Sequence, residues 1–181
     1  MPSQKGSRTC CSPPGTVALV ATSDVFYCIH VGWTLAFWLR FDSLRNLSSF
    51  ENASFISFPG GFYVRPSNIS GLDVSVILKD KIYRVSNTVN MLERNWYHIT
   101  ITWDFMDTLT VYHNLVGKFS SVEESYSGAS TSDSKLHIGC SLERWCSCES
   151  ISVADVIFWS KVLSGEEITR KFQCSGYSLG K

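Results

Sequence analysis

The sequence lacks the features that direct a chain into a membrane or onto nucleic acid. Residues 1–15 contain no apolar stretch of the kind that a signal peptide carries. Residues 16–41 are apolar on average, but Asp24, His30 and Arg40 interrupt them, so they do not predict a membrane-spanning helix. Sixteen basic residues balance sixteen acidic ones, and the charges are scattered, so no long-range field attracts nucleic acid. We therefore expect no membrane insertion by this segment and no nucleic-acid partner.

Sequence motifs for catalysis are missing as well. The chain contains no G-x-S-x-G motif. Two carboxylates on one face of a strand need i, i+2 or i, i+4 spacing, whereas Glu123-Glu124 and Glu166-Glu167 are adjacent pairs. We therefore predict that the protein is not an enzyme. A glycosidase-type enzyme is the catalytic alternative, and it requires two carboxylates that face one concave sheet about 5–10 Å apart. The histidines have no short metal-binding spacing: His30, His98, His113 and His137.

Apolar and aromatic side chains are abundant enough for one buried core. Of the 181 residues, 44% are hydrophobic and 13% are aromatic, and a chain of this length fits one domain better than two. The first fifteen residues are rich in Ser, Pro, Cys and Gly, which favour loose structure. We predict a loose N-terminal segment at 1–27 and one β-sandwich domain at 28–181.

Alternation of apolar and polar residues predicts strands along most of this domain. In residues 33–41 the core-facing side chains are Trp33, Leu35, Phe37, Leu39 and Phe41. In residues 95–103 they are Tyr97, Ile99, Ile101 and Trp103. Other strands are predicted at 54–58, 61–65, 72–79, 81–86, 108–113, 135–139 and 150–159, with polar loops at 42–54 and 120–134. Many short strands separated by turn residues are typical of an all-β fold with two packed antiparallel sheets.

A short helix is predicted near the C-terminus, over residues 165–173. Ser164 and Glu167 have the spacing of a capping box, in which each side chain hydrogen-bonds to the backbone N–H of the other residue. Leu163 and Ile168 stand at the positions of a hydrophobic staple. This is the only helix that the sequence predicts.

Cysteine content and glycosylation motifs indicate an oxidising compartment. Asn46, Asn52 and Asn68 each begin an N-x-S sequon. Zinc binding is the alternative use of the cysteines, but C-x₅-C-x-C is not a usual zinc spacing. We expect Cys140 to pair with Cys146 or Cys148, and Cys174 to reach back to another cysteine. The seven cysteines, of which we expect the last five to form disulfides, are Cys10, Cys11, Cys28, Cys140, Cys146, Cys148 and Cys174.

The cellular location follows from the cysteines and sequons, not from a signal peptide. We expect an extracellular protein or the ectodomain of a larger membrane-anchored protein. Because no signal peptide is visible, we interpret the chain as a fragment, a short isoform or a mis-started gene model. A cytosolic protein is the alternative.

Three segments resemble the laminin-G-like and pentraxin-like branch of the concanavalin A-like jelly-roll superfamily. Residues 34–40 (TLAFWLR) resemble its early strand, and residues 95–103 (NWYHITITW) with 109–112 (LTVY) resemble its "W-x-H-x-x-x-T-W" and "L-x-V-Y" pair. Residues 135–139 (KLHIG), with 151–168, resemble "L-x-I-G", "D-x-V-x-I/F-W" and "L-S/T-x-E-E-I". Similar modules occur in the ectodomains of adhesion-class G-protein-coupled receptors, in polycystin-like proteins and in pentraxins. The resemblance implies a jelly-roll sandwich that recognises glycans, proteins or lipid head groups without catalysis, sometimes with calcium.

The chain also departs from that family in ways that bear on calcium. Pentraxins hold calcium with an acidic and amide cluster after the "I-x-G" strand, where this chain has only Glu143 beside Arg144. One carboxylate cannot supply the six to eight oxygen ligands that calcium requires, so the pentraxin-type calcium cluster is absent from the sequence. No cofactor is firmly predicted, and calcium is the possible one. Asp155 matches a family Asp and is a weak metal candidate; the alternative is a hydrogen bond to a nearby loop. Thr100 replaces the pentraxin cysteine, and Leu115 replaces a turn glycine, so the hairpin there is expected to be shortened or shifted.

The predicted function is recognition of a protein or carbohydrate ligand through loops. The expected contact regions are 42–54, 120–134 and 140–149. Arg144 and Trp145 are the candidate ligand-binding residues, because an exposed Trp beside an Arg suits a protein partner or a sugar face; Trp145 covering the disulfides is an equal alternative. A secreted calcium-dependent pentraxin-like lectin is the alternative function.

Overall fold

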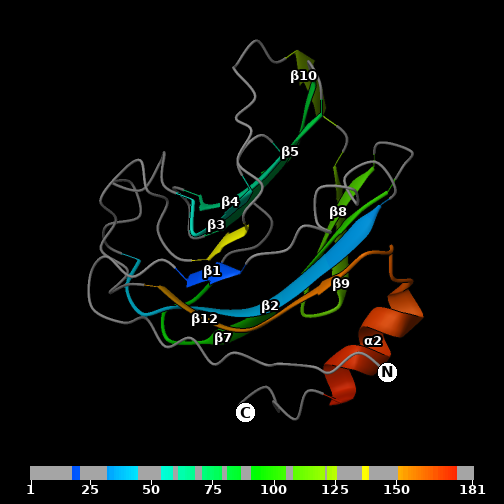
Figure 1. The fold of residues 1–181 in the computed structure, drawn as a ribbon. Coiled ribbons are helices and arrows are strands. Elements are labelled where there is room, and N and C mark those ends of the chain that lie inside the picture. Colours follow the sequence, from blue (N-terminus) through cyan, green and yellow to red (C-terminus); the bar gives the residue numbers. More distant parts are fainter. Residues whose placement is uncertain are drawn as a thin grey trace.

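The computed structural model shows a sandwich of two antiparallel sheets with helix α2 (Gly165–Cys174) outside it (Figure 1). Among the described residues no helix is long and apolar enough to cross a membrane. The structure describes residues 18–20, 32–44, 54–58, 61–67, 71–78, 81–86, 91–104, 108–120, 122–125, 136–138 and 151–174.

The strands divide into a seven-stranded and a five-stranded sheet in the described part of the chain. The seven-stranded sheet has the order β1 (Ala18–Val20), β11 (Leu136–Ile138), β3 (Ile56–Phe58), β4 (Phe62–Pro66), β5 (Leu72–Leu78), β6 (Lys81–Val85) and β10 (Val122–Ser125). The five-stranded sheet has the order β12 (Ile151–Trp159), β2 (Trp33–Phe41), β7 (Trp96–Trp103), β8 (Leu109–His113) and β9 (Val116–Ser120). The expected all-β fold class, with two antiparallel sheets, is confirmed.

The core lies between the two sheets and is built from the alternating residues of their strands. All the residues of β2 and β7 that the sequence assigns to the core are buried there, and Phe37, Leu39, Ile99 and Ile101 are fully buried. β2 and β7 pair antiparallel from Trp33 opposite Trp103 to Arg40 opposite Trp96. A register slip of one residue would turn every core side chain outward, so the apolar pattern excludes that slip. Which residues face each other is set by the pairing of the two strands.

The face of the five-stranded sheet that points away from the core is buried too. Thr34, Trp38, His98 and Thr100 point to this outer face and are at most 8% exposed. Helix α2 (Gly165–Cys174) packs against this face (Figure 1). Where α2 packs, the sheet is therefore covered on both sides, which an alternating sequence alone does not reveal.

The predicted capping box starts α2 as expected. The Ser164 backbone N–H donates to Glu167 Oε2 (2.9 Å), and the Glu167 backbone N–H donates to Ser164 Oγ (3.3 Å). Both staple residues, Leu163 and Ile168, are buried. The segment before the helix is tied to β2, because Thr34 Oγ1 donates to the Lys161 carbonyl and accepts from the Leu163 N–H, each at 2.9 Å.

Three short segments form strands outside the predicted strand ranges: β1, β10, and β9, which is the return strand of the hairpin that follows β8. β1 lies within residues 1–27, which are expected to be loose, and it pairs with β11. β10 lies within the expected loop at 120–134 and pairs with β6. β1 is too short for alternation to be recognised, and β10 (VEES) is a polar edge strand that has a neighbour on one side only. For the rest of residues 1–27 the loose segment stays a prediction.

The hairpin between β8 and β9 differs from the sequence prediction. It is neither shortened nor shifted, because His113 pairs with Val116 across a tight two-residue turn. Asn114 (φ 46°) and Leu115 (φ 73°) both have positive φ, as a type I′ turn requires. Asn114 is held by two hydrogen bonds to the His98 backbone, one through its N–H and one through Oδ1, both at 2.9 Å. The turn therefore forms without glycine, and Leu115 bears the strain.

Candidate functional site

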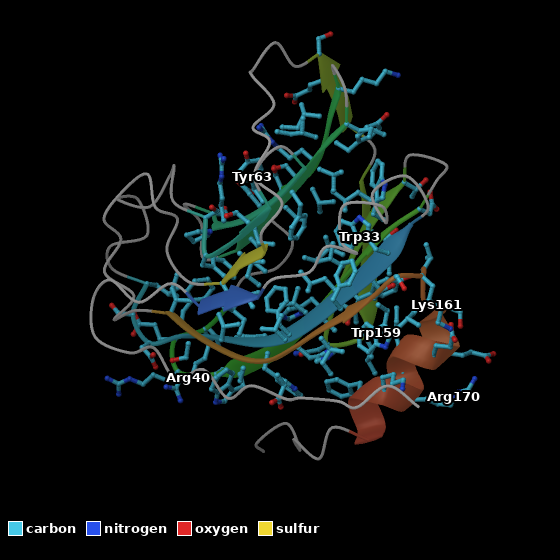
Figure 2. The ribbon with its side chains drawn as sticks, in the orientation of Figure 1. Trp33, Arg40, Tyr63, Trp159, Lys161 and Arg170 are labelled. Atoms are coloured by element: carbon cyan, nitrogen blue, oxygen red, sulfur yellow. The ribbon has the colours of Figure 1, made fainter. Side chains whose placement is uncertain are left out.

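A polar cluster with an aromatic ring lies where β2, β7 and β12 meet at one end of the five-stranded sheet. We call Arg40, Asp42, Trp96 and Ser152 the Arg40 cluster. Arg40 pairs directly with Trp96 on β7 and with Ser152 on β12, so one register brings the three side chains to the same outer face. Figure 2 shows Arg40 at the opposite end of the sheet from Lys161 and α2. The helix therefore does not cover this end.

The Arg40 guanidinium is organised by the residues around it. Nε forms an ion pair with Asp42 Oδ1 (2.8 Å), and Nη2 donates to Ser152 Oγ (3.4 Å). Ser152 Oγ in turn donates to Asp42 Oδ2 (2.8 Å). The guanidinium carbon lies 4.9 Å from the centroid of the Trp96 ring, within cation–π range. The Arg40 and Asp42 side chains are each 33% exposed, so the cluster is preorganised yet open to solvent.

Residues 91–95 border the cluster and are fixed by backbone hydrogen bonds. The Arg94 N–H donates to the Phe41 carbonyl (2.6 Å), and the Leu44 N–H donates to Glu93 Oε1 (2.7 Å). Arg94 has φ 63°, a conformation that costs free energy for a residue other than glycine. Glu93, Arg94 and Asn95 are exposed beside the half-buried Trp96. The end of the sheet therefore presents donors, acceptors and one aromatic ring together.

The chemistry of this arrangement suits binding of a polar ligand. A guanidinium has five N–H donors on three nitrogens, and the contacts above leave Nη1 without a partner among the described residues. A half-buried indole ring beside these groups provides an apolar surface of defined orientation.

The carboxylates that could be considered for catalysis are held in structural contacts. Asp42 binds Arg40 and Ser152, and Glu93 accepts from the Leu44 N–H. Asp104 Oδ1 accepts from the Thr108 N–H at 3.1 Å. These contacts use each carboxylate to fix a chain segment, which does not resemble a pair of catalytic acids.

The ligand-binding residues expected from the sequence, Arg144 and Trp145, lie outside the described residues. The segment that contains them, 139–150, leads directly into β12, one residue before Ser152. The expected contact loop 42–54 begins at Asp42, inside the Arg40 cluster. Neither Arg40 nor Trp96 is among the candidate binding residues predicted from the sequence. The alternation of the strand could have indicated the outer face for Trp96, because Trp96 directly precedes the core residue Tyr97.

Asp155 lies at an irregularity of β12 and not at the start of a strand. The β2–β12 register shifts between Ala154 and Ile157, which is the pattern of a β-bulge, and Asp155 has φ 48° there. Asp tolerates this left-handed conformation better than most residues, so the bulge gives a structural reason for Asp at this position. Among the described residues no group of three or more His, Cys, Asp or Glu side chains could hold a metal ion.

The other predicted sites fall largely outside the described part. This holds for Asn46, Asn52 and Asn68, and for the side chains of Cys28, Cys140, Cys146, Cys148 and Cys174. The backbone of Cys174 is described and ends α2. The glycosylation sites and disulfides therefore stay predictions.

Two histidines are buried on opposite faces of the five-stranded sheet. His98 lies on the outer face, and burial lowers its pKa from 6.5 to about 4. His113 stacks on Tyr97 (centroids 4.9 Å apart), and burial lowers its pKa as well. Neither ring is an acid–base group at neutral pH, since both are held in the uncharged form.

The comparison with protein families decides the classification of the chain. The profile of a laminin G family, described as the concanavalin A-like lectin/glucanases superfamily, matches residues 15–169. The chain belongs to this family. The resemblance inferred from the strand motifs is thus confirmed. No curated protein matches the chain in a sequence comparison.

Solved structures with the same concanavalin A-like fold include receptor-binding domains of botulinum neurotoxins. The serotype D binding domain has a TM-score of 0.62 at 16% identity, covering 90% of this chain and 42% of that one. The C/D mosaic receptor-binding domain has a TM-score of 0.60 at 18% identity (88% and 40% covered). A serotype D domain in complex with N-acetylneuraminic acid has a TM-score of 0.58 at 19% identity (80% and 37% covered). The chain thus spans about two fifths of the length of these structures, and the likeness establishes the fold.

Proposed function

We propose that this chain is a non-catalytic extracellular recognition module that binds a glycan or protein ligand at the end of the sandwich with the Arg40 cluster. The observation that carries the proposal is Arg40: its side chain is 33% exposed, and its guanidinium is held by Asp42 and Ser152 and lies over the Trp96 ring. Such a group loses little conformational freedom on binding, which favours affinity. Trp and Arg are also the residues that most often dominate binding interfaces.

A glycan is the ligand that this chemistry suits best. Sugar hydroxyls both donate and accept hydrogen bonds, and the cluster offers an acceptor in Asp42 and a donor in Arg40. The apolar face of a sugar ring packs against aromatic rings such as Trp96. One fold neighbour was solved with N-acetylneuraminic acid, which makes sialylated glycans reasonable probes.

The undescribed loops belong to the same proposal. We expect 42–54 and 139–150 to extend the binding surface, with Arg144 and Trp145 as further contacts, because both segments join the sheet at the Arg40 cluster. Disulfides among Cys28, Cys140, Cys146, Cys148 and Cys174 would stabilise that surface in an oxidising compartment. Glycans on Asn46, Asn52 and Asn68 would mark an accessible face.

A calcium-dependent lectin is the second candidate function, and it must be distinguished from calcium-independent recognition at the Arg40 cluster. Asp155 is its weak candidate ligand, and its position in a β-bulge favours a structural role. Calcium titration monitored by thermal unfolding distinguishes the two. We expect no shift in Tm at millimolar calcium, whereas a saturable increase would support the calcium-dependent lectin.

The experiment that tests the proposed site is a printed glycan array with a matched pair of variants. Trp96→Ala removes the aromatic ring under Arg40. Tyr63→Ala is the control, because on the other sheet Arg65 lies over Tyr63 at the same 4.9 Å; Figure 2 shows Tyr63 far from Arg40. Unfolding midpoints of both variants are measured, so that loss of binding is interpreted only for folded protein.

We expect Trp96→Ala to lose binding at least tenfold, which corresponds to about 1.4 kcal/mol, and Tyr63→Ala to bind as the wild type does. If Trp96→Ala is unfolded, Arg40→Lys replaces it, because lysine keeps the charge but not the planar fork. Unchanged binding by the folded variant would show that the site lies elsewhere. The recognition function would be contradicted if the wild type bound none of the printed glycans and also no member of a panel of cell-surface ectodomains.

A further inference from the structure

Helix α2 forms a small packing unit outside the main core. The Phe172 ring stacks on Trp38 (centroids 5.5 Å, interplanar 29°) and contacts the His98 ring edge-on at 4.9 Å. Trp38 and His98 are themselves in edge-on contact at 5.1 Å. None of these three residues belongs to the core cluster between the sheets. Opening of α2 therefore breaks this contact without separating the sheets.

The two ends of α2 are attached differently. Its N-terminal end is fixed by the capping box, by the buried Leu163 and Ile168, and by the hydrogen bonds of Thr34. Its last turn rests on the sheet through Phe172, which packs on Trp38 and His98. Of the two rings that Phe172 contacts, the His98 ring is titratable.

His98 is poorly placed to carry a charge while α2 is docked. Its neighbours cover the ring, and only 8% of the residue is exposed. Its Nδ1 lies 3.4 Å from Thr100 Oγ1, and burial lowers the pKa to about 4. No charged residue of the described part forms an ion pair with it. The titratable or charged groups on the neighbouring elements are Arg40 on β2 and Asp42 just after it, Tyr112 and His113 on β8, Asp155 on β12, and Glu166, Glu167, Arg170, Lys171 and Cys174 on α2.

We propose that α2 is an acid-released cover of the sheet: protonation of His98 expels Phe172 and frees the last turn of the helix while the two sheets stay packed. The proton comes from solvent, and the reverse step returns it. Release exposes Trp38, which is 2% exposed in the closed form. The cover is independent of the glycan or protein site, because it lies away from the Arg40 end.

The size of the effect follows from linkage. An imidazole exposed by opening has a pKa of about 6.5, so the open form binds a proton more tightly than the closed form below that pH. The opening constant of α2 is thus independent of pH above 6.5 and increases as the pH falls towards 4. Between pH 7.5 and 5.5 the opening constant of α2 is expected to rise about tenfold.

Hydrogen exchange followed by mass spectrometry tests the cover on the intact, oxidised chain, in which the disulfide expected at Cys174 keeps the opened turn tethered. Exchange of a peptide spanning 165–174 is measured at pH 7.5 and 5.5, corrected for intrinsic rates, with a peptide spanning β5 as the reference for the sheets. His98→Gln keeps a polar side chain that does not titrate, and His113→Gln is the matched control on the opposite face of the sheet. We expect about tenfold faster opening of α2 at pH 5.5 in the wild type and in His113→Gln, and no acid effect in His98→Gln.

Three results would overturn the proposal. One is an equal acid effect on α2 in His98→Gln, and another is simultaneous exchange of α2 and β5. The third is a His98 pKa at or above 6.5 in the wild type, measured by NMR titration, which would mean that the aromatic rings stabilise the cation. The NMR titration needs no variant, so it decides the proposal even if His98→Gln does not fold.

Discussion

Gly32, which precedes β2, is the position where one added carbon should cost the most. Its φ is +95°, a conformation that L side chains rarely adopt. A Cβ there would lie 2.7 Å from Val162 Cγ2 and 3.0 Å from the Trp103 carbonyl oxygen. The backbone contact cannot be relieved by a side-chain rotation, because it requires β2 to move relative to β7.

The expected cost of Gly32→Ala combines strain and overlap. Positive φ costs an alanine about 1–2 kcal/mol, and forcing a methyl group into a packed site adds about 1–3 kcal/mol. We therefore expect the free energy of unfolding to fall by about 2–4 kcal/mol, which corresponds to a Tm decrease on the order of 10 °C for a domain of this size. Urea unfolding followed by tryptophan fluorescence, with the disulfide state held constant, measures it.

A double-mutant cycle separates the two contributions. Val162 is 38% exposed, so Val162→Ala alone should cost little, and it removes the methyl group that the Cβ added by Gly32→Ala would touch. We expect Gly32→Ala to be about 1 kcal/mol less costly in the Val162→Ala background. A cost below about 0.5 kcal/mol in the wild-type background would refute the reasoning. An equal cost in both backgrounds would show that Val162 is not the obstacle.

Three other substitutions or conditions have defined outcomes. Ser164→Ala removes the oxygen that caps the Glu167 N–H, and urea unfolding should show a loss of about 1 kcal/mol. Leu115→Gly removes the strain of a side chain at φ 73° and should raise the free energy of unfolding by about 0.5 kcal/mol, measured as a slightly higher Tm. The gain is small because glycine has more conformational entropy in the unfolded chain, which offsets part of the relief. The free energy of unfolding should be highest above pH 6.5 and should fall as the pH is lowered towards 4. Burial lowers the pKa values of His98 and His113 in the folded chain, so below pH 6.5 the unfolded chain binds more protons than the folded chain does. His98 alone accounts for about 1 kcal/mol at pH 5.5, and urea titrations at pH 7.5 and 5.5 would contradict this if the midpoints coincide.

Local patterns in the sequence determined much of the architecture. Alternation in residues 33–41 and 95–103 identified β2 and β7 and their core faces, because side chains on a strand point to opposite sides in turn. The pairing of Ser164 with Glu167 located the start of α2, since a capping box is closed within four residues. The family profile adds that these pieces belong to one known fold.

Tertiary structure alone decided which outward-facing residues meet. Arg40 joins Trp96 and Ser152 because strands distant in sequence share one register, and no local pattern encodes that register. His98 is buried beneath Phe172 only because α2 packs back onto the sheet. β1 and β10 become strands because a sheet edge is available to pair with them. Sequence periodicity specified which side chains enter the core, whereas long-range pairing specified the Arg40 cluster and the surface that α2 covers.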